Sequence, residues 1–221
     1  MQEISDLAVA DKPRLRGVSH LVAFVVSIGA GLWLVVVDAP NAETRIVAAV
    51  YALGLLGMFG ASALLHIGSW RTGAYGNLLK LDHSMIFVMI AGSYTPLAWL
   101  ALDDPMRVIV LAAVWIGAGF GIVFEWTSRR IPKGWSLTLY ITLGWIAVLA
   151  IPWLLDSLGT AAFVLLVAGG LLYTLGAVFH AARWPDPIPH VFGYWEVFHA
   201  MVIAAVVCHF VCIARYALPR G

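Results

Sequence analysis

The sequence predicts an all-α integral membrane protein built as a bundle of seven transmembrane helices. Of its 221 residues, 62% are hydrophobic and only 11% are charged, and the mean hydropathy is +0.92. A soluble domain averages about 25% charged residues. The chain is long enough for about seven spans of roughly 20 residues with short connections, which leaves no segment for a soluble domain. We therefore expect a single membrane domain over residues 1–221.

Seven apolar runs, each bounded by charged or turn-forming residues, account for the predicted helices. In chain order they are residues 17–37, 46–67, 81–100, 106–126, 135–155, 158–179 and 191–214. The sixth run ends before the proline-rich stretch WPDPIP, residues 184–189, because proline cannot continue a helix. Small residues that let helix backbones approach closely occur in the second and fourth runs: Gly54, Gly57, Gly60, Gly117 and Gly121.

Lysine and arginine predict the orientation of the bundle, because they are enriched on the cytoplasmic side. Nine fall on the side of the N-terminus: Lys12, Arg14, Arg16, Arg71, Lys80, Arg129, Arg130, Lys133 and Arg183. Four fall on the other side: Arg45, Arg107, Arg215 and Arg220. We therefore expect the N-terminus in the cytoplasm and the C-terminus outside. Residues 1–16 are polar and lack the apolar core of a signal peptide, so they form a cytoplasmic N-terminal segment and the first run directs insertion.

Four polar side chains are expected to meet at the cytoplasmic end of the bundle. Ser62 and His66 lie four residues apart on one face of the second helix, near its cytoplasmic end. Asp82 stands near the cytoplasmic start of the third helix, and His199 lies in the first turns of the seventh. Ionisable groups inside a membrane are costly and usually face a partner or a wet cavity. The sequence therefore predicts that these side chains share one cavity.

The other histidines and the two cysteines receive simpler interpretations. Side chains at cytoplasmic helix ends are expected to snorkel to water, which applies to His20, His83, His180 and His190. His209 lies about 15 Å along the helix axis from His199, too deep to join the same site. Cys208 and Cys212 are expected to be buried thiols, with a soft-metal site in CHFVC, residues 208–212, as the alternative.

Two imidazoles and a carboxylate in an apolar cavity favour a zinc site that keeps one position for water. Zinc lowers the pKa of such a water to about 7 and so supplies a hydroxide that attacks a carbonyl. Ser62 is suited to hydrogen-bond the water or a developing oxyanion, and Asp82 is suited to act as a base. We therefore predict Ser62 and Asp82 as catalytic residues, and His66, His199 and Asp82 as metal ligands.

The same residues lie in motifs that resemble the hemolysin III family, the bacterial branch related to the progestin and adipoQ receptors. The similarity runs nearly end to end in six separate motifs. They are PRLRGVSHL (13–21), SALLH (62–66), LDHSMIFVMIAGSYTP (81–96), GW (144–145), GGLLYTLGAVF (169–179) and FGYWEVFHAMV (192–202). The resemblance implies seven helices, a cytoplasmic N-terminus and a zinc site near the inner leaflet.

In the family that site combines the His of a Ser-x-x-x-His motif, an Asp on the next helix and a His-x-x-x-His pair on the last helix. Ser62, His66, Asp82 and His199 match these positions, but the first His of the pair falls on Trp195. Indole offers only a hydrogen-bond donor and cannot replace an imidazole lone pair. Three outcomes stay open: Asp82 completes the ligand set, His180 or His83 swings in, or hydrogen bonds hold a metal-free cluster. Glu196 is expected to support the ligands or to be a helix N-terminal charge.

Three functions follow from these observations. The first is a metal-dependent hydrolase of lipid amides or esters at the inner leaflet, similar to the family's ceramidase relatives. The second is a non-enzymatic membrane-homeostasis or receptor-like lipid sensor, which the loss of a ligand favours. The third, cytolysis, comes from the family name, although the sequence has no secretion signal and no charged channel ring. We expect a multi-pass plasma membrane protein whose partners are lipids, because a net charge of +1 without a basic run does not favour nucleic acid.

Overall fold

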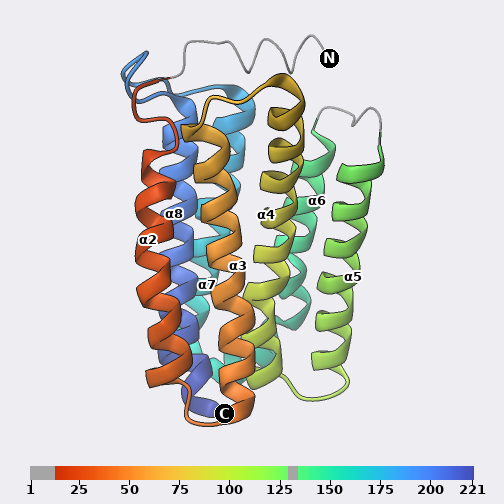
Figure 1. The fold of residues 1–221 in the computed structure, drawn as a ribbon. Coiled ribbons are helices and arrows are strands. Elements are labelled where there is room, and N and C mark those ends of the chain that lie inside the picture. The colour runs from red at the N-terminus through yellow and green to blue at the C-terminus, as the bar shows by residue number, and fades with distance from the viewer. Residues whose placement is uncertain (1–12, 129–133) are drawn as a thin grey trace.

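The computed structural model describes residues 13–128 and 134–221. Their regular structure is helical apart from one isolated β-bridge between Ile188 and Phe192. The α-helices are α2 (Val18–Trp33), α3 (Ala42–Ile67), α4 (Thr72–Ala101), α5 (Met106–Thr127), α6 (Trp135–Gly144), α7 (Ile151–Ala182) and α8 (Tyr194–Cys212), as Figure 1 shows. Shorter π or 3-10 segments extend them: η1 (Leu34–Asp38), η2 (Ile146–Ala150), η3 (Ile213–Ala217) and η4 (Leu218–Arg220).

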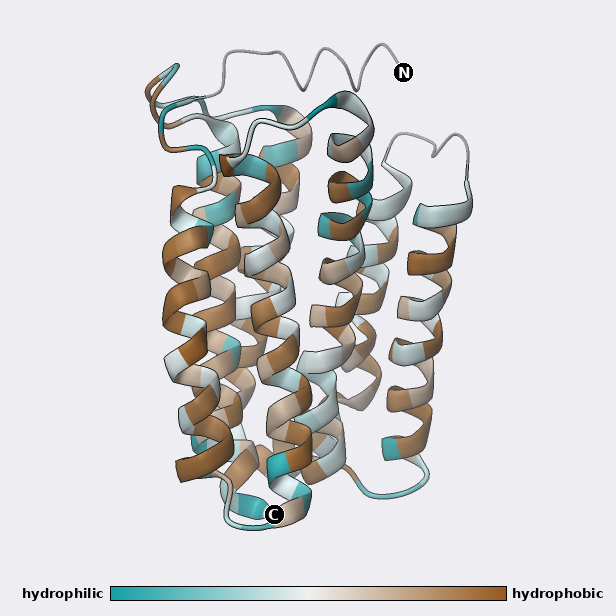
Figure 2. Ribbon diagram, viewed as in Figure 1, coloured by the Kyte–Doolittle hydropathy of each residue, from teal (hydrophilic) through white to brown (hydrophobic). Residues whose placement is uncertain are grey.

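Within the described residues, six helical segments are long and apolar enough to cross a membrane. Many large apolar side chains point outward, among them Val25, Leu53 and Ile116, which are 59%, 67% and 71% exposed. In Figure 2 the hydrophobic residues run along the lengths of the helices, and the hydrophilic residues gather mainly at the two ends. Such a surface matches hydrocarbon rather than water. The prediction of an all-helical integral membrane protein is therefore confirmed.

The predicted runs 135–155 and 158–179 form one series of helices, α6, η2 and α7. This series is a single apolar segment of 48 residues, Trp135–Ala182. It is interrupted at Trp145, where the backbone leaves the α-helical region. A second break occurs at Gly159, whose φ of 79° and ψ of 172° are a conformation that glycine adopts at little cost. The second break lies close to the boundary predicted between the two runs.

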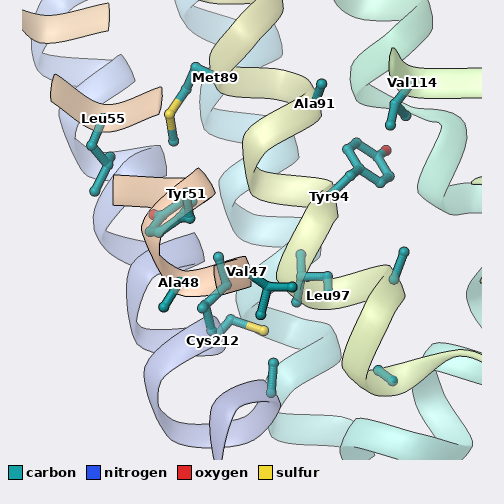
Figure 3. Close-up of a cluster of buried hydrophobic side chains, with 14 of the residues drawn as sticks. Val47, Ala48, Tyr51, Leu55, Met89, Ala91, Tyr94, Leu97, Val114 and Cys212 are labelled. Atoms are coloured by element: carbon teal, nitrogen blue, oxygen red, sulfur yellow. The ribbon is translucent and has the colours of Figure 1, made fainter. Parts of the chain in front are cut away.

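Close backbone contacts join the neighbouring helices. A Cβ atom on Gly54 of α3 would lie 3.5 Å from the Cα atom of Met89 of α4, and a Cβ atom on Gly121 of α5 would collide with the ring of Phe87. The predicted role of these glycines in packing is therefore confirmed. A cluster of buried side chains fills the interior, and Figure 3 shows Tyr51 of α3, Leu97 of α4 and Cys212 of α8 within it.

The polar residues that are predicted to form the site lie at one end of the bundle. The start of α2, the end of α3, the start of α4, the end of α7 and the start of α8 all lie at this end, which is uppermost in Figure 1. The chain ends at the opposite end of the bundle. The predicted site residues on three different helices are therefore brought to the same end.

Candidate functional site

Local structure sets the positions of the helix ends that carry the site. Helix α3 ends at Ile67 because Gly68 has an extended backbone with ψ of 157°. This places Ser62 and His66 in its last turns. Helix α8 starts after Gly193, whose backbone N–H donates to Glu196 Oε2 at 2.7 Å. The backbone N–H groups at the start of a helix have no partner within the helix, and a carboxylate in the first turn stabilises the helix by accepting from them. Glu196 therefore fixes the start of the helix that carries His199.

His66 and His199 are neighbours in a buried cluster, as their predicted shared cavity requires. Their ring centroids lie 5.0 Å apart, and the two residues are 5% and 1% exposed. His20 of α2 joins them: its ring stacks on that of His199 with centroids 3.9 Å apart and an interplanar angle of 24°. The cluster of His20, His66 and His199 therefore links α2, α3 and α8.

The prediction that His20 snorkels to water is wrong. His20 is only 3% exposed and also meets the edge of Phe59, with ring centroids 5.1 Å apart. Gly17, in a left-handed conformation with φ of 80°, turns the chain so that α2 starts against His66. This close start places His20 inside the bundle, which a hydropathy pattern does not reveal.

The other three histidines at this end lie outside that cluster. His180 is half-buried, with its ring 4.4 Å from that of Trp195, so it also packs inward. The side chain of His83 is 34% exposed and its Nδ1 lies 3.5 Å from Glu125 Oε2. His190 is exposed on the loop before α8. Surface access is thus confirmed for His190, whereas His83 and His180 are only partly exposed.

Ser62 and Asp82 form the second part of the site. Ser62 is 4% exposed, and its hydroxyl lies close enough to the carboxylate of Asp82 to interact with it. This contact joins the end of α3 to the start of α4. The structure thus places Ser62, His66, Asp82 and His199 at one end of the bundle (Figure 1), with the serine beside the carboxylate.

Trp195, at the position where the motif resemblance implies a histidine, lies beside His66. Its ring centroid lies 5.1 Å from that of His66 and 6.1 Å from that of His199. Its only polar atom, Nε1, donates to the hydroxyl of Tyr194 at 3.0 Å. The indole therefore presents carbon to the histidines, and its single donor is used elsewhere.

Arg16 covers this cluster at the same end of the bundle. Its Nε donates to Glu196 Oε1 at 2.7 Å, and its guanidinium carbon lies 5.1 Å from the centroid of Trp195. The backbone N–H of Arg14 donates to the carbonyl of His190, which ties the same segment to the loop before α8. Glu196 is therefore a helix N-terminal charge paired with Arg16, one of its two predicted roles. Sequence reasoning did not assign a role to Arg16, although it lies in the motif PRLRGVSHL.

The side chains as they stand do not fit a zinc ion. Within residues 13–128 and 134–221, no group of three or more His, Cys, Asp or Glu side chains is arranged to hold a metal. The stacked rings of His20 and His199 lie side by side instead of converging on one point, and Trp195 fills space beside His66 with carbon. In the described part of the chain, the buried Nδ1 of His199 has no hydrogen-bond partner.

The cysteines show no metal site either. Cys212 is buried, and its Sγ donates weakly to the carbonyl of Ala162 at 3.6 Å. Cys208 is partly exposed. His209 Nε2 lies 3.3 Å from the carbonyl of Leu166, and its ring meets that of Tyr173. The buried thiol is confirmed for Cys212, and His209 is directed towards α7.

The fold and the site define a multi-pass helical membrane protein with a histidine-rich cluster at one end of the bundle. Comparison with known proteins identifies the class more closely. The family model described as "Haemolysin-III related" matches residues 9–210. The chain belongs to this family, which confirms the resemblance seen in its motifs.

Individual relatives align over most of the chain. Identity to "Hemolysin-3" of Bacillus cereus is 33% over 208 residues, which cover 92% of this chain and 91% of that protein. Identity to the "Hemolysin-3 homolog" of Bacillus subtilis (strain 168) is 30% over 206 residues, covering 91% and 92%. The human "Monocyte to macrophage differentiation factor" is 28% identical over 178 residues, covering 78% and 71%.

Proposed function

We propose that the chain crosses the plasma membrane seven times, with its N-terminus in the cytoplasm. As one straight helix, the 48-residue segment Trp135–Ala182 would be about 72 Å long, more than twice the hydrocarbon thickness of about 30 Å. The break at Gly159 supports two crossings within it. The start of α2 and the end of the chain lie at opposite ends of the bundle in Figure 1, which requires an odd number of crossings.

The charge asymmetry supports the direction of insertion. Five of the nine basic residues on the proposed cytoplasmic side lie in the described part of the chain. The other four, Lys12, Arg129, Arg130 and Lys133, lie outside the described residues.

Cysteine labelling in a background without Cys208 and Cys212 tests this topology. We expect Asp156→Cys, next to the break at Gly159, to react with a membrane-impermeant maleimide in intact cells. Ser128→Cys, at the other end of the bundle, should react only in inverted vesicles. Labelling of Asp156→Cys from the cytoplasmic side would contradict the seven-crossing topology.

We propose that the protein acts as a non-enzymatic lipid sensor or membrane-homeostasis protein. The observation that carries this proposal is Trp195, which packs against His66 and uses its only donor on Tyr194. The histidine cluster joins three helices through ring contacts and is closed by the Arg16–Glu196 pair. A lipid that binds one arrangement of these helices more tightly than another shifts their population, which is the physical basis of sensing.

A hydrolase is the second candidate, and the interaction of Ser62 with Asp82 favours it. This pair lies on α3 and α4 at the same end of the bundle as His66 and His199 (Figure 1), so this end offers a carboxylate, a hydroxyl and two imidazoles. Cytolysis rests only on the name of relatives such as "Hemolysin-3" of Bacillus cereus. It stays a prediction.

Turnover of a lipid amide by reconstituted protein distinguishes sensor from hydrolase. We expect wild type to hydrolyse a ceramide no faster than His199→Ala in liposomes with added zinc, because the indole replaces a ligand. The hydrolase candidate predicts activity that falls about 100-fold or more in Ser62→Ala. Ser27→Ala is the matched control, since Ser27 is also buried but only donates to the carbonyl of Ala23.

A further inference from the structure

Two cavities at the end of the bundle opposite the histidine cluster meet at Leu102, which lines both. The first has a volume of about 90 Å³ and is lined mainly by apolar side chains of α4, η2 and α7, with Ser93 and His209 among its polar lining residues. The second has a volume of about 220 Å³ and is lined by the charged residues Asp103, Arg107, Asp156 and Arg220. An apolar cavity next to a charged one matches the two parts of a phospholipid, its apolar acyl chains and its charged headgroup.

The apolar cavity lies at the helix break at Trp145, and side-chain hydrogen bonds hold this break in place. The Tyr94 hydroxyl donates to the carbonyl of Gly144 and accepts from the N–H of Ala147, both at 2.7 Å. Trp145 Nε1 donates to the hydroxyl of Thr174 at 3.0 Å. Backbone groups freed by a break within a membrane must be satisfied inside the protein, usually where they line a cavity. These bonds therefore fix the walls of the cavity.

The size of the apolar cavity suits part of a hydrocarbon chain. A dry apolar cavity of about 150 Å³ is known to bind benzene. The smaller cavity here has room only for the end of an acyl chain. A Cβ atom on Gly170, one of its lining residues, would lie 3.7 Å from the ring of Trp145. The absence of a side chain at Gly170 thus keeps this space open.

The charged cavity contains two guanidinium groups and two carboxylates. Arg107 Nε donates to the carbonyl of Leu102 at 2.8 Å, and Arg220 donates to the carbonyl of Ser157. These bonds hold both guanidinium groups at the mouth of the cavity. Asp103 and Asp156 are exposed beside them. A headgroup with one phosphate and one ammonium matches this set, because guanidinium binds phosphate with two donors and the carboxylates attract the amine.

We propose that the two cavities form one binding site for an aminophospholipid of the outer leaflet. The phosphate lies between Arg107 and Arg220, the ammonium lies at Asp103 and Asp156, and the end of one acyl chain occupies the apolar cavity. The outer leaflet follows from the proposed topology. The site is separate from the histidine cluster, so its failure in an experiment leaves the proposed function of that cluster unaffected.

Native mass spectrometry of the detergent-solubilised protein titrated with phosphatidylethanolamine tests the headgroup contacts. We expect wild type to bind one such lipid more tightly than phosphatidylglycerol. Arg107→Gln with Arg220→Gln should raise the dissociation constant about tenfold or more. Arg215→Gln is the matched control, an exposed arginine at the same end that lies outside the residues lining either cavity.

A second pair of variants tests the acyl chain. Gly170→Leu fills the apolar cavity and should weaken phosphatidylethanolamine binding about tenfold while leaving glycerophosphoethanolamine binding unchanged. Gly119→Leu is the control, because a Cβ atom there has no neighbour within 4 Å. Asp156 lies on the surface, so we expect Asp156→Asn to leave the fold intact. This change should remove the preference for phosphatidylethanolamine over phosphatidylglycerol. Wild-type affinity in the arginine double variant, or equal affinity for the two lipids in wild type, would overturn the proposal.

Discussion

Replacing Trp195 with histidine is expected to give the protein a zinc site, raising its metal content from trace to about one ion per chain. Position 195 lies one turn before His199 on the same face of α8, with its side chain already beside His66. An imidazole there adds a third nitrogen to the two that the scaffold already brings together. Removing the indole also frees the space in which a metal and its water would lie. Elemental analysis after dialysis against a weak chelator measures the gain.

Two controls make this result specific. Trp184→His introduces a histidine at an exposed tryptophan outside the cluster and should bind no zinc. His66→Ala in the Trp195→His background should lose the ion again. If Trp195→His stays metal-free while remaining folded, the cluster is not the remnant of a ligand set, and the comparison with the family motif is misleading at this position.

Removing the guanidinium of Arg16 is expected to destabilise the protein by about 3 kcal/mol, because it leaves the carboxylate of Glu196 buried without its charge partner. Glu196 is 1% exposed and the side chain of Arg16 is 15% exposed, so solvent screens the pair only weakly. For a chain of this length, about 3 kcal/mol corresponds to a decrease in Tm of roughly 6–12 °C. Thermal unfolding of Arg16→Ala in detergent, followed by circular dichroism, provides the measurement.

The matched control is Arg14→Ala, two residues earlier. The side chain of Arg14 is exposed and its hydrogen bond to His190 is made by the backbone, so loss of the side chain should change stability by less than about 0.5 kcal/mol. Glu196→Gln in the Arg16→Ala background should recover part of the loss, since the amide carries no charge. Equal stability of Arg16→Ala and wild type would show that the ion pair does not hold the N-terminal segment on α8.

Hydropathy and residue type predicted the class of fold and the place of most helices. They located the ends less well: the third run was predicted from residue 81, whereas α4 starts at Thr72. Hydropathy marks the part of a helix that faces lipid, but the backbone hydrogen bonds of the helix continue into the polar residues beyond that part. The break at Trp145 was also missed, because Tyr94, far away in sequence, satisfies the freed backbone groups.

The candidate site was predictable where it depended on helix register. Ser62 and His66 share a face, and His199 begins the last helix, so these residues meet once the helices pack. His20 and Arg16 were not predictable, since their inward positions depend on the turn at Gly17 and on the tertiary contact with Glu196. The importance of Trp195 came only from the family motif, because a tryptophan near a helix end is otherwise unremarkable in a membrane protein.

The metal content of the wild-type protein tests the central claim most directly. That claim is that the chain keeps the scaffold of its family but packs an indole where a metal ligand belongs. Wild type purified with zinc present and then dialysed should contain no stoichiometric zinc, and His199→Ala should leave that value unchanged. One zinc per chain in wild type, lost in His199→Ala, would contradict the claim and make the hydrolase the better account.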